Sequence, residues 1–335
     1  MNKIIIPEIS KQIYKEDVLN VISDEYSLIG PIWTNHQLEW INGIYQSFKD
    51  HDKFIIIIYL INKTLNFYSR NFTKVSYENF YEKNTIEIER FNIKEIALNL
   101  KLPKESARRK IIELEKDGII KRGKKKIIID RSIYSNFKPT KSIIRTSRFL
   151  SSISKILSQN KILAKSYDTE NLELIIKKNF SYIWKLYYEL QIPFLISFKK
   201  IFGDVETFHI FGTCVVNEHL SSKKFNKVKL KRLEFIKTLS LTKKGINAMS
   251  ISDISGIPRA TVVRKLNKLI KLNRLKINDK KQYTSNKSFI NELEPKQYEV
   301  LKALSGFITE VFNLLIQEDN KSNNQFEVPV YLKSF

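Results

Sequence analysis

The stretch "LPKESARRKIIELEKDGII" at 102–120 decides the fold that this sequence predicts, because a related stretch, "IPRATVVRKLNKLIKLNRL", follows at 257–275. Aligning Pro103 with Pro258 sets an offset of 258 − 103 = 155 residues, close to half of the 335-residue chain. Apolar residues recur at spacings of four and three in both stretches, at Ala107, Ile111 and Leu114 and again at Val262, Leu266 and Leu269. This period is typical of a helix with one buried face. The sequence therefore predicts two related helices in one chain.

The offset also aligns residues that suit the same backbone conformation. Gly118 aligns with Asn273 and Gly123 with Asn278, and glycine and asparagine are the residues that best tolerate a positive φ. The first pair predicts the residue that follows a helix, and the second predicts the turn of a hairpin. Both halves are thus expected to share one local fold.

The order of elements follows from the segments around each helix. "NIKEIALNL" at 92–100 predicts a short amphipathic helix, and Pro103 suits the first residue of the next helix. "IIKRGKKKIIID" at 119–130 then predicts two short strands around a basic turn, and "LKINDKKQYT" at 275–284 repeats the pattern. We expect a mainly α protein with small β-hairpin wings.

Both "IALNLKLPKESARRKIIELEKDGII" at 96–120 and "SISDISGIPRATVVRKLNKLIKLNRL" at 250–275 resemble the winged helix-turn-helix modules of bacterial transcriptional regulators of the broad MarR and IclR type. With its hairpin, each resemblance covers only about 35 to 45 residues, and the remainder resembles no family we can name. The resemblance implies that 103–116 and 258–271 are recognition helices that enter the major groove, with the hairpins touching the DNA backbone or minor groove.

The expected organisation is a tandem duplication of this winged helix-turn-helix domain with flanking helices. Repeat 1 would occupy 1–145, with its module at about 85–132, and repeat 2 would occupy 146–335, with its module at about 230–287. A C-terminal helix is expected at about 294–318, and the aromatic segment at 180–202 fits a packed helix. No Pro/Gly/Ser-rich linker separates the halves, so we expect them to pack together.

Charge and hydropathy limit the class of partner. The chain has 58 Lys and Arg against 35 Asp and Glu, a formal charge of +23 that is typical of proteins with a polyanionic partner. An AT-rich genome also enriches lysine, so the position of the charge matters more than its total. The longest apolar run, at 54–61, is far shorter than the roughly 20 residues that span a bilayer. We expect a cytoplasmic, nucleoid-associated protein with double-stranded DNA and no membrane as partner.

The residues expected to contact DNA lie on the outer face of each helix and on each hairpin. In the first copy they are Lys104, Glu105, Arg108, Arg109, Ile112 and Lys116 on the helix and Arg122, Lys124, Lys125 and Lys126 on the hairpin. In the second copy they are Arg259, Thr261, Arg264, Asn267 and Lys271 on the helix and Lys280 and Lys281 on the hairpin. The hairpin lysines suit phosphate contacts that carry no sequence information.

The expected role of a residue depends on whether the two copies carry the same residue at its position. Arg109 and Arg264 share one register, which favours a positioning contact to phosphate in both copies. Arg108 could reach guanine and Asn267 could pair with adenine, so the two helices are expected to prefer different bases. Ile112 would meet a thymine methyl or be buried. One chain would then act as a covalent pseudo-dimer on an asymmetric site, with a homodimer of two chains as the alternative.

Two other functions remain open. Plasmid-type replication initiators also carry two winged helices in one basic chain, and a winged helix can serve as a scaffold in a larger complex. An enzyme is not expected: the nine glycines form no phosphate-binding loop, and His36, His51, His209 and His219 show no metal-ligand spacing. Cys214 is expected in the core, each of the four histidines is expected either at the surface or fully hydrogen-bonded in the core, and no cofactor is expected. A small-molecule effector is left unknown, although the aromatic segments at 33–40 and 180–202 offer a possible ligand-sensing region.

Overall fold

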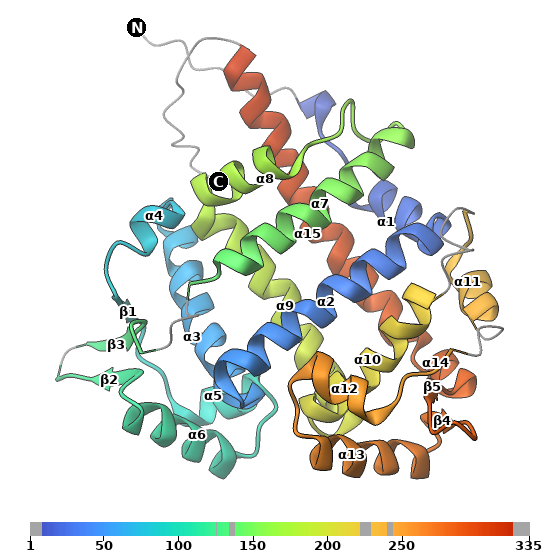
Figure 1. The fold of residues 1–335 in the computed structure, drawn as a ribbon. Coiled ribbons are helices and arrows are strands. Elements are labelled where there is room, and N and C mark those ends of the chain that lie inside the picture. The colour runs from blue at the N-terminus through green and yellow to red at the C-terminus, as the bar shows by residue number, and fades with distance from the viewer. Residues whose placement is uncertain (1–8, 125, 134–137, 222–228, 240–243, 324–335) are drawn as a thin grey trace, which may run out of the picture.

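The computed structural model describes residues 9–124, 126–133, 138–221, 229–239 and 244–323, with side chains up to residue 319. The protein is mainly helical and carries two small antiparallel sheets, as Figure 1 shows. One continuous hydrophobic core takes side chains from helices throughout the sequence. The expectation of a mainly α protein with small hairpins is confirmed.

The first half of the chain forms a series of seven α-helices and three strands within the described residues. After a short 3-10 turn (Ile9–Lys11) come α1 (Lys15–Asp24), α2 (Tyr26–Phe48), α3 (His51–Arg70), α4 (Tyr77–Phe80), β1 (Thr85–Ile88), α5 (Ile93–Asn99), α6 (Lys104–Lys116), β2 (Ile120–Arg122), β3 (Ile127–Asp130) and α7 (Thr140–Gln159).

The second half repeats this order. It contains α8 (Thr169–Lys178), α9 (Phe180–Phe202), α10 (Val205–Ser221), α11 (Arg232–Leu239), α12 (Ala248–Ser255), α13 (Arg259–Lys271), β4 (Leu275–Ile277), β5 (Tyr283–Ser285), α14 (Lys287–Glu292) and α15 (Glu294–Asn323). Counterpart helices begin 154 or 155 residues apart: α1 and α8 give 169 − 15 = 154, and α6 and α13 give 259 − 104 = 155. Helices α2 and α9 both have 23 residues.

The connection from α2 to α3 is built like the connection from α9 to α10. Helix α2 is followed by Lys49 with φ of 54°, and α9 is followed by Gly203 with φ of 87°. An aspartate follows in each case. Asp50 Oδ1 accepts hydrogen bonds from the backbone N–H groups of residues 52 and 53, and Asp204 Oδ1 accepts one from Thr207. Each aspartate therefore caps the helix that follows it.

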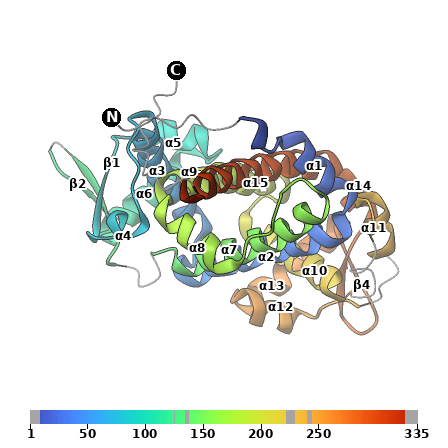
Figure 2. The ribbon, with the colours of Figure 1, turned by 90° about the horizontal axis from the view of Figure 1, so that it is seen from above.

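The halves contact each other reciprocally. Helix α3 packs on α9 and α10 on α2, while α1 packs on α15 and α8 on α7. Exchanging these helices for their counterparts turns each of the four contacts into another of the four, as in the interface of a two-fold symmetric dimer. Figure 2 shows α1 beside α15 and α7 beside α8. The boundary expected between residues 145 and 146 falls within α7, and the C-terminal helix continues to residue 323.

Matching hydrogen bonds support this reciprocity. Ser154 on α7 binds both backbone groups of Tyr167, which precedes α8, at 2.9 and 3.2 Å. Asn313 on α15 binds both backbone groups of Ile13, which precedes α1, at 2.8 and 3.0 Å. Each half thus holds the entry of the other half's first helix through one polar side chain.

The two sheets are related but unequal. Strand β3 lies between β1 and β2, with Ile129 opposite both Ile86 and Ile120. Among the described residues the second sheet consists of β4 and β5, and Ile246 forms a single bridge to Tyr283; residues 240–243, which align with β1, lie outside the described residues.

The predicted backbone conformations hold at one pair of positions and fail at the other. Gly118 and Asn273 follow their helices with φ of 76° and 53°, which confirms the first prediction. Gly123 and Asn278 lie between the two strands of their hairpins, as predicted, but neither has the positive φ that their residue types suggested. Asn278 instead uses its side-chain oxygen, which accepts hydrogen bonds from the N–H groups of residues 280 and 282, and Lys281 adopts the left-handed conformation.

Candidate nucleic-acid interface

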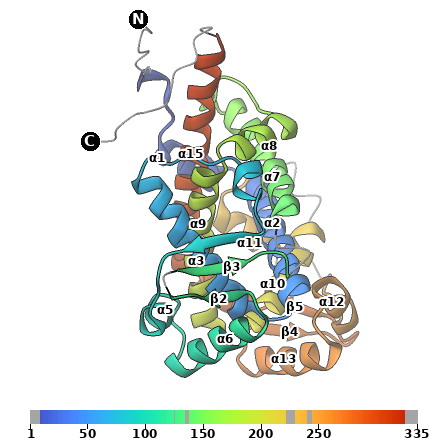
Figure 3. The ribbon, with the colours of Figure 1, turned by 90° about the vertical axis from the view of Figure 1, so that its left-hand side faces the viewer.

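Helices α6 and α13 lie at the same end of the molecule. Figures 1 and 3 both show them along its lower edge, and in Figure 1 the β2–β3 and β4–β5 hairpins flank them on the outside. We call α5, α6 and β2–β3 the first unit and α12, α13 and β4–β5 the second unit. The arrangement gives one end of the molecule two exposed helices, each accompanied by a hairpin.

Each helix is held by a buried stripe. Ala107, Ile111 and Leu114 in α6 are fully buried, as are Val262, Leu266 and Leu269 in α13. The apolar faces predicted from the sequence are therefore confirmed, and the opposite faces are left at the surface.

An equivalent ion pair links each exposed helix to its half. Lys110 Nζ lies 2.6 Å from Asp50 Oδ2, and Lys265 Nζ lies 2.6 Å from Asp204 Oδ2. Burial raises the pKa of Asp50, but hydrogen bonds from Lys110 and the backbone N–H of Lys53 outweigh it and hold that pKa below its usual value. The aspartate that caps the preceding helix thus also anchors the exposed helix.

The predicted residues of the first unit lie at the surface. Lys104, Glu105, Arg108, Arg109 and Lys116 are exposed, and so are Arg122, Lys124 and Lys126 on the hairpin. Ile112 is 38 % exposed, so of the two alternatives for this residue the surface position holds. Lys125 lies outside the described residues.

Glutamates lie among these cations. Glu105 is 3.4 Å from Arg108, and Glu113 is 3.8 Å from Arg109. Glu115 pairs with Arg122 of the hairpin. Helix α6 therefore carries five basic and three acidic residues, 5 − 3 = +2.

A shallow groove runs between α6 and the hairpin of the first unit. Its lining includes Lys94 as well as the predicted residues Lys104, Arg108 and Arg122. The Arg122 guanidinium lies 4.9 Å from the ring centroid of Phe91. Sequence analysis missed Lys94 and Phe91 because the second copy has Met249 and Ile246 at these positions, so the comparison of the repeats gave no signal.

The second unit presents a different surface. Arg259, Arg264, Asn267, Lys271, Lys280 and Lys281 are exposed, and Thr261 is half-buried. Helix α13 has five basic residues and no acidic one, 5 − 0 = +5. Asp204 is the acidic partner of Lys265 and lies 4.0 Å from Lys268. The outward face of α13 is thus positive with little compensation.

The cysteine and histidine side chains, which were not expected to form a metal or catalytic site, lie in the core. Cys214 is fully buried, and burial raises the pKa of its thiol. All four histidines are buried, and burial lowers the pKa of His36 to about 3 and that of His51 to about 4. The expectation that every histidine would be at the surface or fully hydrogen-bonded is wrong, because His36, His51 and His209 each retain one ring nitrogen without a partner in the described structure.

Two further statements hold for the described residues alone. No group of three or more His, Cys, Asp or Glu side chains there is placed to hold a metal ion. Within the same ranges, no helix combines the length and the apolar character needed to cross a membrane.

Comparison with known proteins gives no match to a family model, to a curated protein or to a solved structure.

Proposed function

We propose that this protein binds double-stranded DNA through two tandem winged helix-turn-helix modules, the first and second units, and regulates transcription. The observation that carries the proposal is the placement of two exposed basic helices, each with a hairpin, at one end of a single body. Helices of this size fit the major groove, and basic hairpins beside them suit the flanking phosphates.

Individual roles follow from exposure and pairing. Arg109 and Arg264 occupy the same register, and the Arg109 side chain is 69 % exposed with only a long contact to Glu113. Both are assigned to phosphate, where they set the position of the helix. Arg108 and Asn267 are assigned to base edges, and each correct pair is worth about 1–3 kcal/mol of discrimination.

The reciprocal contacts between the halves support a pseudo-dimer in one chain. In a homodimer the two-fold interface joins two polypeptides, whereas here both sides of the equivalent interface belong to one polypeptide. The two reading faces differ in sequence, so the preferred site is asymmetric.

The test begins with selection of bound duplexes from a random pool, followed by affinity measurements at fixed salt. Arg264→Ala with Lys271→Ala and, separately, Arg109→Ala with Lys116→Ala should each weaken binding at least tenfold, because each pair removes two cations from a reading face. The matched control is Lys141→Ala with Lys155→Ala, which removes two exposed cations from α7. Equal affinities for all three double variants would contradict the proposal.

Mapping of bound DNA in cells separates the regulator from the other candidates. Binding at dispersed promoters supports regulation, and binding confined to tandem repeats at an origin identifies a replication initiator. Failure to select any duplex, with partner proteins still captured, identifies a scaffold.

A further inference from the structure

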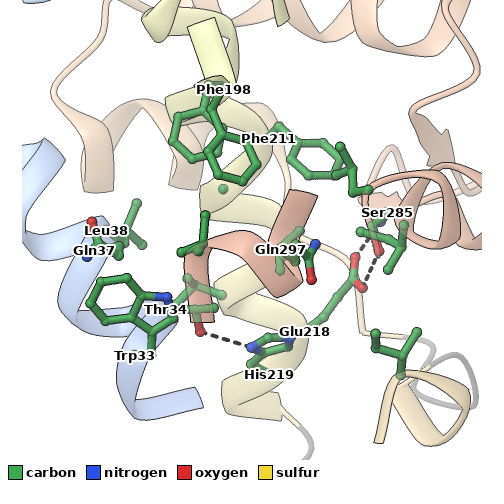
Figure 4. Close-up of a pocket in the computed structure, with 18 of the residues that line it drawn as sticks. Trp33, Thr34, Gln37, Leu38, Phe198, Phe211, Glu218, His219, Ser285 and Gln297 are labelled. Carbon is green, nitrogen blue, oxygen red and sulfur yellow. Dashed lines mark hydrogen bonds between the residues drawn. The ribbon is translucent and has the colours of Figure 1, made fainter. Parts of the chain in front are cut away.

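A cavity of about 250 Å³ lies behind the hairpin of the second unit. Its walls come from both halves of the chain, from α2 on one side and from α9, α10, α14 and α15 on the other. Figure 4 shows the aromatic and polar side chains that gather around it. The apolar part of the lining includes Trp33, Leu38, Phe194, Phe198, Phe211 and Leu301. Cavities of this kind, with apolar walls and a few polar groups, are typical of small-molecule sites.

A glycine keeps the cavity open. Gly212 lies in the middle of α10 and lines the cavity, and a Cβ atom added there would meet no atom within 4 Å. Glycine within a helix is less stable than alanine, so packing of the helix itself gives no reason for this residue. Gly43 in α2 also has open space around the Cβ position but does not line the cavity.

The charges around the cavity indicate the character of a ligand. Lys276 and Lys287 line its exposed end, and neither has an ion-pair partner in the parts of the chain that the structure describes. Glu218 is buried and already accepts two hydrogen bonds from Ser285, one of them at 2.7 Å from the Ser285 hydroxyl. Burial also raises the pKa of Glu218, which favours the uncharged form. The available charge is therefore positive.

Two buried side chains in the wall carry polar atoms without a hydrogen-bond partner. Both amide atoms of Gln37 and one ring nitrogen of His209 have no partner among the residues described. Buried polar groups are rarely left unpaired, and those that are tend to serve a binding role or to meet an unseen molecule. Together with the open space at Gly212, they distinguish this cavity from ordinary core packing.

We propose that this cavity binds an apolar aromatic molecule with an anionic head group, whose ring lies between α2, α9 and α10 and whose head group lies at Lys276 and Lys287. The site also reaches the hairpin, because Lys276 belongs to β4, and Ser285 of β5 donates to Glu218. Binding of the head group neutralises a cation of the hairpin.

The test uses the full chain and two matched probes, 2-naphthoate and its neutral analogue 2-naphthamide, titrated by calorimetry. Naphthoate should bind one per chain and more tightly than naphthamide. Gly212→Leu fills the cavity and should weaken naphthoate at least tenfold, whereas Gly43→Leu, an equivalent helical substitution outside the wall, should leave it unchanged. Circular dichroism melts confirm that both variants fold.

Lys287→Gln tests the head group, because Lys287 is exposed and forms no ion pair in the described parts of the chain. It should weaken naphthoate about fivefold, the loss of one solvent-accessible ion pair, and leave naphthamide unchanged. The inference is overturned if the wild-type chain does not bind naphthoate, if Gly212→Leu binds it as well as Gly43→Leu does, or if Lys287→Gln affects both probes equally.

The effect on DNA rests on the proposed function. Naphthoate should lower DNA affinity about threefold, and DNA should lower naphthoate affinity by the same factor, because coupling between two sites is reciprocal. If the chain binds naphthoate but no DNA, the proposed function is wrong and the assignment of the cavity stands. If the chain binds DNA but not naphthoate, the assignment of the cavity is wrong and the proposed function stands.

Discussion

At the scale of single residues, one aspartate in each half performs two tasks. Asp50 and Asp204 each cap a helix with one side-chain oxygen and pair with a lysine of the exposed helix through the other. A lysine match between the halves is weak evidence in a chain so rich in lysine. The structure shows that the match of Lys110 with Lys265 reflects a shared contact, which spacing alone could not reveal because the aspartate lies about 60 residues earlier.

Loss of this ion pair should loosen the exposed helix. Lys110→Met leaves Asp50 partly buried without its partner, and the expected loss is about 1–2 kcal/mol in the free energy of unfolding, between the values for exposed and buried pairs. Urea denaturation measures it. Lys116→Met, which removes an exposed lysine of the same helix, serves as the control and should change stability by less than about 0.5 kcal/mol.

Adding Asp50→Asn to Lys110→Met should recover part of the loss, because asparagine keeps the cap and removes the unpaired charge. A double variant less stable than Lys110→Met would show that the ion pair is not the source of the effect.

At the scale of elements, the sequence predicted the helices well and the hairpins less well. Helical periodicity places α6 and α13 because burial of one face follows directly from spacing. Turn geometry depends on which atoms form hydrogen bonds, so the use of the Asn278 side chain could not be read from residue type. The groove residues Phe91 and Lys94 could not be predicted by comparing the repeats, because the second copy has Ile246 and Met249 at the matching positions.

The two exposed helices differ in net charge, and this difference predicts unequal dependence on salt. If both units bind DNA as proposed, binding of α13 releases more counterions from the DNA than binding of α6, because the glutamates of α6 partly neutralise its cations. Arg264→Ala with Lys271→Ala should therefore reduce the slope of log affinity against log salt by about 2, and Arg109→Ala with Lys116→Ala should reduce it by less. Titrations at four salt concentrations measure both slopes. A larger change for the α6 variant would reverse the assignment.

At the scale of the whole molecule, the halves share one core. The reciprocal packing of α3 on α9 and α10 on α2 places the long aromatic helix of each half against the other half. The absence of a linker in the sequence indicated contact between the halves, but not its two-fold character. That character requires knowing which faces meet, and more than half of the residues of both α2 and α9 are buried, so periodicity does not single out the face that meets the other half.

One shared core predicts one unfolding transition. Thermal unfolding followed by circular dichroism and by tryptophan fluorescence should give coincident curves, because Trp33 and Trp184 lie in the same core as the helices of both halves. Cleavage between 159 and 169 should not release two stable halves, since each would expose the apolar face that the other covers. Two separate transitions, or a folded fragment 1–159, would contradict the shared core.

The reciprocal interface has a final consequence for how the protein would respond to its own abundance. A homodimer must assemble before it can occupy a two-part site, so at low concentration its occupancy rises with the square of the amount of protein. Here the counterpart surfaces are joined in one polypeptide, so a single chain that fills both half-sites as proposed needs no assembly step before binding. If the two units act on DNA as proposed, occupancy of the site rises in direct proportion to the number of chains. A substitution in one unit then changes the preference for one half of the target site and leaves the preference for the other half unchanged.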